Sequence, residues 1–360
     1  GDIVLRHLNL AKNWQDFLGA MAIPSVLPAV IPYADRENNI AIKVIGMFPK
    51  HKLTTEEPFA TLDQAVGRNH ELLDADSLPT QHNPSNGVVI YANHQVPGLL
   101  DRGPLLADRW HPPTRAMRIE QLIQQVKKHD PGTFDVIQDD KHDLFAEQFI
   151  KTFAPYMGGH SLVTWNGDTR DTQSTFKFEG LMRELAVNLF PELPRSQMLE
   201  YMDQWPMHRW SMMALLRKHL QNEGEAFARG VIEQSLKASD AIKWKRRQNI
   251  EFRHSLGYGP IGRWLFNLRI PYEGGSRETI HVERMNSDFL SSGQEVKRHK
   301  GMSFGPALKM IFDLGPSQSM HGLVTNGKHY LPIYRSARKV VKEWQRGERF
   351  QWQISDAASD

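Results

Sequence analysis

The chain has 360 residues, of which 40% are hydrophobic and 24% charged, so it can bury a full core as one large domain or two ordinary ones. Its 44 Lys and Arg against 41 Asp and Glu leave a formal charge of +3, which argues against nucleic acid as a partner. The absence of cysteine excludes disulfide bonds, thiolate metal sites and a cysteine nucleophile, but it does not decide the compartment.

The first third of the chain predicts a helix, a hairpin and a buried strand. Apolar residues at helical spacing predict one helix over residues 8–21. Residues 32–35 and 37–46 predict a β-hairpin whose turn is supplied by residues 35–39. Residues 47–86 are expected to be loop with one short helix near 62–73, and GVVIYANHQ (87–95) predicts a buried strand that runs directly into Asn93.

The middle of the chain is predicted to be helical, roughly over residues 114–245. Thr114 is expected to cap a helix that runs through Lys128, and residues 143–157 and 174–190 continue the pattern. Strand signals return in GGSRETIHVER (274–284) and in residues 308–314, and an amphipathic helix is expected over 333–345. Residues 88–91 and 310–314 are apolar enough to predict strands that are buried on both faces.

The sequence gives little support to several chemical motifs and to a membrane span. The only long uncharged stretch, residues 17–34, contains three prolines and cannot form one continuous membrane helix. Residues 257–262 match G-x-G-x-x-G, but Pro260 lies inside the would-be phosphate turn. The basic run at 243–247 is more typical of a solvated helix end than of a phosphate-binding patch, and the sixteen histidines show no zinc-ligand spacing.

A series of short segments, taken together, is more specific than any of these motifs. In chain order the segments are AKNWQDF (11–17), YAD (33–35) with NI (39–40), GVVIYANHQVPG (87–98), TR (114–115), WNGD (165–168), FRHSLG (252–257) and GPALKMIFDL (305–314). This series resembles the β chain of penicillin acylase-like N-terminal-nucleophile hydrolases, a group that includes penicillin, cephalosporin and acyl-homoserine lactone acylases. The resemblance covers nearly the whole chain.

The resemblance implies an α+β fold, part of an αββα sandwich with a large helical insertion. The expected organisation is sandwich over residues 1–113, helical insertion over 114–250 and a return to the sandwich over 251–360. The implied activity is hydrolysis of an N-acylated small molecule, such as an antibiotic or a quorum signal, by a zymogen-derived periplasmic heteromer. The implied partner is a companion α chain, with neither nucleic acid nor membrane as a partner, and no cofactor is expected; calcium, bound by some members, is left open.

Three residues acquire expected roles from the resemblance. Asn93 corresponds to the asparagine whose side chain holds the tetrahedral oxyanion, and Arg115, 22 residues later, to an arginine that orients it. Ala29 corresponds to a position that lines the acyl pocket. Without the resemblance, Asn93 would be a turn residue before Pro97, Arg115 a helix residue paired with an acidic neighbour, and Ala29 part of the core.

Departures from the family pattern keep a second hypothesis open. Gly1 has neither hydroxyl nor thiol, so the nucleophilic serine and the nucleophile-bearing part of the β chain are expected to lie before residue 1. The family segments near 244–248 and 326–334 are eroded. The alternative to an active amidase is therefore a catalytically inactive family member that acts as a binding or scaffold protein.

Overall fold

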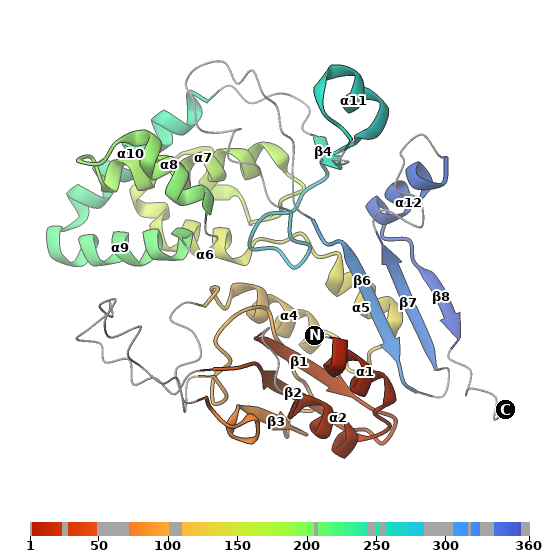
Figure 1. The fold of residues 1–360 in the computed structure, drawn as a ribbon. Coiled ribbons are helices and arrows are strands. Elements are labelled where there is room, and N and C mark those ends of the chain that lie inside the picture. Colours follow the sequence, from red (N-terminus) through yellow and green to blue (C-terminus); the bar gives the residue numbers. More distant parts are fainter. Residues whose placement is uncertain are drawn as a thin grey trace, which may run out of the picture. The chain divides into compact units, whose positions relative to one another are not determined.

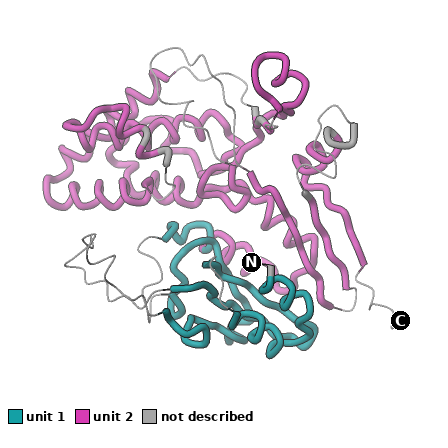
Figure 2. The backbone as a smooth tube through the Cα atoms, in the orientation of Figure 1, with its two compact units in different colours: residues 1–116 teal, residues 117–360 magenta. Residues whose placement is uncertain are grey.

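The computed structural model describes residues 2–23, 28–48, 72–100, 110–204, 208–242, 249–252, 256–283, 305–315, 318–324 and 335–353. The chain divides into two compact units, Gly1–Ala116 and Met117–Asp360, which Figure 2 shows in teal and magenta. Both contain helices and antiparallel strands (Figure 1). The predicted division at residues 113 and 250 stays a prediction.

The first unit is built on a three-stranded antiparallel sheet. Its strands are β1 (Ala29–Ala34), β2 (Ile40–Ile45) and β3 (Thr80–His82), and β2 lies in the centre. The predicted hairpin is confirmed, because β1 pairs with β2 in a register that sets Ala34 opposite Ile40. Asp35 closes the turn, since its Oδ1 accepts the backbone N–H groups of Glu37 and Asn39 at 2.8 and 2.9 Å.

Alternation along β2 buries both faces of this sheet. Ile45 packs with Phe17 and Met21 in a cluster on one side, whereas Ile42 and Val44 pack with Leu78, Leu99 and Leu100 on the other. The side chains of a strand point alternately to opposite faces, so one strand supplies both clusters. The second cluster includes Tyr91 and Trp110 at its margin, and it therefore supports the chain segments on either side of Asn93.

The predicted single helix over residues 8–21 is wrong, because the chain forms two helices there. They are α1 (Asp2–Leu10) and α2 (Trp14–Met21). Asn13 stands at the N-cap of α2 with extended backbone, and its side chain accepts the N–H of Asp16 at 2.9 Å. Apolar spacing continues through the break, but the cap residue starts a new helix.

The second unit begins with the helical block that the sequence predicts. Its helices are α4 (Thr114–Gln124, shared with the first unit), α5 (Pro131–Gln138), α6 (Leu144–Phe153), α7 (Thr172–Leu189), α8 (Arg195–Gln204), α9 (His208–Glu223) and α10 (Glu225–Asp240). Thr114 is the first residue of α4, and α4 ends at Gln124, not at Lys128. Short 3₁₀ turns lie in this unit at Ala154–Tyr156 and Ser161–Thr164. A further 3₁₀ turn, at Ala75–Ser77, belongs to the first unit.

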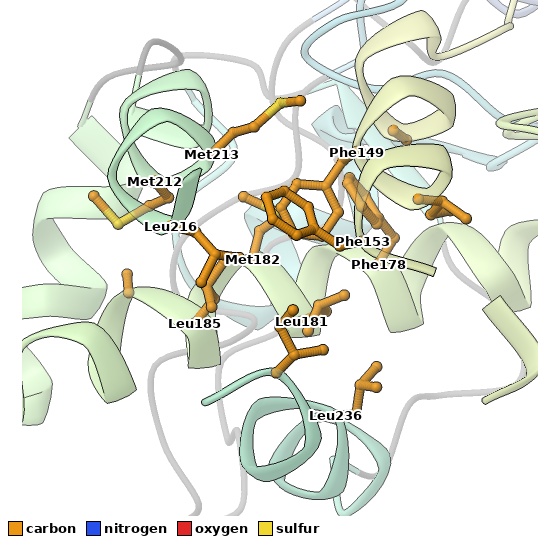
Figure 3. Packing of buried hydrophobic residues seen from close by; sticks show 14 of the residues in the cluster. Phe149, Phe153, Phe178, Leu181, Met182, Leu185, Met212, Met213, Leu216 and Leu236 are labelled. Atoms are coloured by element: carbon orange, nitrogen blue, oxygen red, sulfur yellow. The ribbon is translucent and has the colours of Figure 1, made fainter. Parts of the chain in front are cut away.

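Helix α7 is the centre of this block. Its buried face packs with residues of α6, α8, α9 and α10 in one cluster, of which Figure 3 shows Phe149, Phe153, Phe178, Leu181, Met182, Leu185, Met212, Met213, Leu216 and Leu236. Most of these side chains are fully excluded from solvent. Each such burial contributes about 1.5–3 kcal/mol, so this cluster accounts for much of the stability of the unit.

The other elements that the structure describes in the second unit are short antiparallel strands and two helices. The elements are β4 (Asn249–Phe252), α11 (Gly259–Phe266), β5 (Leu268–Pro271), β6 (Leu308–Asp313), β7 (Ser319–Val324), α12 (Arg335–Gln345) and β8 (Phe350–Gln353). β4 pairs with β5, and β7 lies between β6 and β8. The strand predicted at 308–314 and the helix predicted at 333–345 are thus confirmed within the described residues.

The predicted strand over 274–284 is wrong as far as residue 283, the last that the structure describes there. The segment is a buried bend in which Gly274 and Gly275 have φ of +103° and +121°, values that an L side chain rarely adopts. Its polar groups bond to the N-terminal end of α6 and to the loop before α7. Ser276 Oγ donates to Asp143 Oδ2 at 2.6 Å, and Thr169 Oγ1 accepts the N–H of Gly275 at 2.7 Å.

The prediction that residues 88–91 and 310–314 form strands buried on both faces is also wrong. In β6 alternate residues are exposed: Leu308, Met310 and Phe312 are 55%, 39% and 53% accessible. Residues 88–91 are half-buried and form no strand. Apolar composition predicts that a segment is covered, but strand formation needs a neighbour whose backbone groups are in register. Among the described residues no strand pairs with 88–91, and the bridge between His94 and His111 lies beyond this segment.

Among the described helices, none is both long and apolar enough to cross a lipid bilayer. The helix predicted near residues 62–73 lies mainly outside the described residues. The basic run at 243–247 and the eroded family segments near 244–248 and 326–334 lie wholly outside them.

Candidate active site

Asn93 follows the half-buried segment 88–91, in a bend of the chain. Its backbone is left-handed, with φ of +62°, a conformation that asparagine adopts more readily than most residues. Neighbours on either side are buried, since Ala92 is 8% and His94 7% accessible, whereas Asn93 itself is exposed. The turn therefore exposes the amide side chain of Asn93 between two buried residues of the first unit.

Arg115 holds that side chain in one orientation. Its Nη2 donates to Oδ1 of Asn93 at 3.0 Å and to the carbonyl oxygen of Ala92 at 2.9 Å. Because the guanidinium occupies Oδ1, the amide is turned so that its NH₂ group faces away from Arg115. The structure thus brings Asn93 and Arg115 into contact, and the roles that the family resemblance implies for them stay predictions.

The backbone of His111 fixes the other side of the turn. Its N–H donates to the carbonyl oxygen of Asn93 at 3.0 Å, next to the bridge that pairs His94 with His111. The segment before α4 therefore contributes a backbone contact to Asn93 in addition to the side chain of Arg115, which follows at the start of the helix.

Electrostatics around the turn favour neutral imidazoles. Burial, together with the Arg115 charge, lowers the pKa of His111 from about 6.5 to about 4. The same two causes lower the pKa of His94 below its usual range, and burial raises the pKa of Tyr91. Near neutral pH, Arg115 is thus the cation of this turn, and the histidines beside it are uncharged.

Ala29 lies in the same unit but in a different setting. It is the first residue of β1, opposite Ile45, and it is half-buried against the cluster that contains Phe17 and Met21. None of the described contacts joins Ala29 to Asn93. Its assignment to an acyl pocket stays a prediction, and core packing is the role that these contacts show.

The segment WNGD (165–168) has a structural role. Gly167 has φ of +88°, and a Cβ there would lie 2.6 Å from the carbonyl oxygen of Asp143, so only glycine fits. The carbonyl oxygen of Gly167 in turn accepts the N–H of Asp143 at 2.8 Å. This contact seats Asp143 at the N-cap of α6, where its Oδ1 accepts the N–H of Ala146.

Charged residues in the second unit form buried structural pairs. Arg209 pairs with Glu179 and lies 4.0 Å from Asp143, and Lys309 pairs with Asp139, with all except Asp139 nearly inaccessible. Burial raises the pKa of Asp143, and it lowers that of Lys309. Over the ranges that the structure describes, no group of three or more His, Asp or Glu side chains is arranged to hold a metal ion.

Comparison with known proteins defines the class to which this fold and turn belong. The family model for penicillin amidase matches residues 4–360, and the chain therefore belongs to the penicillin amidase family. Among solved structures it is similar to the thermostable penicillin G acylase from Alcaligenes faecalis, with a TM-score of 0.61 and 15% sequence identity over 98% of this chain and 69% of that one. A search of curated proteins found no match.

His94 and His111 were not predicted as part of this site. The sequence shows both only as members of a scattered set of histidines without metal-ligand spacing. His94 could have been suspected because it directly follows Asn93. His111 lies 18 residues after Asn93, beyond a loop. Periodic patterns in a sequence do not reveal which residue after a loop contacts a turn before it.

Proposed function

We propose that this chain is part of an N-acyl amide hydrolase and supplies the side-chain donor for the oxyanion that forms during amide cleavage. The observation that supports this proposal most directly is the contact between Arg115 and Asn93. An exposed amide whose oxygen is held by a guanidinium presents its NH₂ group as a fixed neutral donor. Preorganised donors of this kind stabilise charge that develops only in the transition state.

The proposed reaction follows the family scheme of an N-terminal serine nucleophile. The serine hydroxyl attacks the acyl carbon and passes its proton to the α-amino group of the same residue. The carbonyl oxygen becomes an oxyanion that accepts a hydrogen bond from Asn93 Nδ2. Collapse of the tetrahedral intermediate breaks the C–N bond, the leaving amine takes the proton, and water then releases the acid from the acyl ester by the same transfers.

The finer features of the family are proposed with the same basis. We propose an αββα sandwich formed by residues 1–113 and 251–360, with residues 114–250 inserted as a helical block. We further propose a periplasmic location, a hydrophobic acyl group whose pocket includes Ala29, a companion α chain, and a nucleophilic serine on a segment outside these 360 residues.

The test compares two left-handed asparagines in the complete protein, including the segment with the nucleophile. Asn93→Gly keeps a residue suited to positive φ and removes only the amide, so kcat for p-nitroanilides of hydrophobic acids should fall about 10²–10³-fold with little change in KM. Asn38→Gly is the matched control, because Asn38 has φ of +65° in the turn after β1.

Two outcomes would count against the proposal. Full activity in a folded Asn93→Gly variant would remove Asn93 from the reaction. If the wild-type protein hydrolyses none of the anilides but binds the acyl compounds, the scaffold or binding function is the better account of the family membership.

A further inference from the structure

Asn93 depends on its neighbours for the direction in which its amide points. A turn around one left-handed residue can relax by rotation of the peptide groups on either side of it. The carbonyl oxygen of Ala92 is held by Arg115, and the carbonyl oxygen of Asn93 is held by the N–H of His111. A third contact within the turn is made by the N–H of Ala92, which donates to Nδ1 of His94 at 3.3 Å.

We propose that His94 is a positioning residue for the oxyanion donor: its imidazole closes the Ala92–Asn93–His94 turn and so keeps the Asn93 amide in its productive direction. This inference rests on the proposed function. It adds a residue that never touches the substrate, because the ring of His94 is buried, whereas Asn93 is exposed.

The contact requires one protonation state of His94. A backbone N–H can only donate, so Nδ1 must carry a lone pair, and the proton of the neutral ring is on Nε2. A second proton would convert Nδ1 into a donor that faces another donor. Burial of the ring and, second, the charge of Arg115 on α4 disfavour that proton. The other titratable groups beside the ring, Tyr91 and His111, are uncharged near neutral pH.

Two substitutions separate this role from mere packing. In His94→Asn the side-chain oxygen can take the place of Nδ1 and accept the N–H of Ala92. In His94→Gln the amide reaches instead toward the place of Nε2, and the turn loses its acceptor. Both changes introduce a neutral polar group, so a difference between them reports the position of the acceptor.

The experiment measures kcat and KM of both variants in the complete protein, with p-nitroanilides of hydrophobic acids as probes. His94→Gln should lower kcat about 10–100-fold with KM within about twofold, because a misplaced donor weakens only the transition state. His94→Asn should retain kcat within about threefold. The control His219→Gln, on a half-buried residue of α9 that bonds to Glu223, should match wild type.

Crystal structures of the variants separate this inference from the proposed function. In His94→Gln the Asn93–Arg115 hydrogen bond should be lost, and in His94→Asn it should persist. If Asn93→Gly is fully active, the proposed function fails, and these structures still decide what His94 does. Equal kcat in the two His94 variants, an intact Asn93–Arg115 bond in His94→Gln, or unfolding of His94→Gln alone would each overturn the inference.

Discussion

Arg115 uses a single guanidinium nitrogen for two acceptors that belong to adjacent residues, the carbonyl oxygen of Ala92 and the amide oxygen of Asn93. One contact fixes the backbone before the turn and the other fixes the side chain within it. The planar guanidinium is suited to this pair, because its donors have a rigid geometry that an ammonium group lacks.

Arg115→Lys should therefore lower kcat by about 10²-fold while the melting temperature stays nearly unchanged, since charge is kept and only the geometry is lost. The control is Arg118→Lys on the same helix. Arg118 donates from Nε and Nη2 to the two carboxylate oxygens of Asp140 at 3.0 and 2.8 Å, so its loss should alter stability and not kcat. A fully active Arg115→Lys variant, or one that unfolds, would favour a structural role for Arg115.

His111 should make stability depend on pH. Its folded pKa of about 4 lies below the value of about 6.5 that an unfolded histidine has, so the unfolded chain binds more protons between these values. The free energy of unfolding is highest above pH 6.5 and falls as the pH is lowered toward 4. After discounting for screening by solvent, the loss should be about 1–2 kcal/mol.

Urea unfolding at pH 7, 5.5 and 4.5 measures this effect, and His111→Asn is the comparison. The variant should lose less stability than wild type between pH 7 and 4.5, because it has no imidazole to titrate. Parallel curves for the two proteins would show that His111 is not held neutral by its surroundings.

Helices α7 and α10 approach each other closely at Gly180. A Cβ there would overlap Oγ of Ser239 and lie 3.2 Å from its Cβ, and that Oγ already donates to the carbonyl oxygen of Lys177 at 2.9 Å. Gly180 lies in the buried part of α7, so neither helix can move aside without disturbing the core.

Gly180→Ala should lower the free energy of unfolding by about 1–3 kcal/mol, which is the cost of overpacking. Gly230, in α10, is exposed and has no atom within 4 Å of the place of a Cβ. Gly230→Ala should instead stabilise the protein by about 0.5–1 kcal/mol, the difference in helix propensity. Thermal unfolding of both variants checks this, and a shift of the same sign in both would contradict it.

The elements that sequence predicts well are those whose signal is local. The hairpin of β1 and β2 follows from Asp35 and the alternating residues of β2, and the helical block follows from apolar spacing. The strand expected at 88–91 fails because pairing depends on a neighbour that periodicity does not reveal. The bend at 274–283 fails because its two left-handed glycines and its hydrogen bonds to residues more than 100 positions away override strand propensity.

The candidate site shows the same division. Family segments predicted that Asn93 and Arg115 belong together, and they lie in contact. The contributions of His94 and His111 come from the fold of the turn, in which the His94 side chain accepts the N–H of Ala92 and the backbone N–H of His111 donates to the carbonyl oxygen of Asn93. Ala29 is assigned to the acyl pocket only because it corresponds to a family position. Its described contacts belong to the core of the first unit.

Considered as a whole molecule, the chain has features of a protein that associates. The sheet of β6, β7 and β8 exposes Phe312, Phe350 and Trp352 at 53%, 48% and 47%, and α11 exposes Ile261 and Trp264 at 74% and 79%. Exposed apolar surfaces of this kind are typical of interaction sites. They are in accord with the proposed companion chain.

We propose that the complete protein cleaves amides through an acyl-enzyme, and that Asn93 holds the oxyanion of the tetrahedral intermediate that precedes it. The most direct measurement is intact-mass analysis of every chain after acid quenching during turnover of a p-nitroanilide of a hydrophobic acid. The account predicts an adduct of the acyl mass on an N-terminal serine outside residues 1–360, and a much slower rise of that adduct in Asn93→Gly. Hydrolysis without any adduct, an adduct on this chain, or an equally fast rise in Asn93→Gly would contradict it.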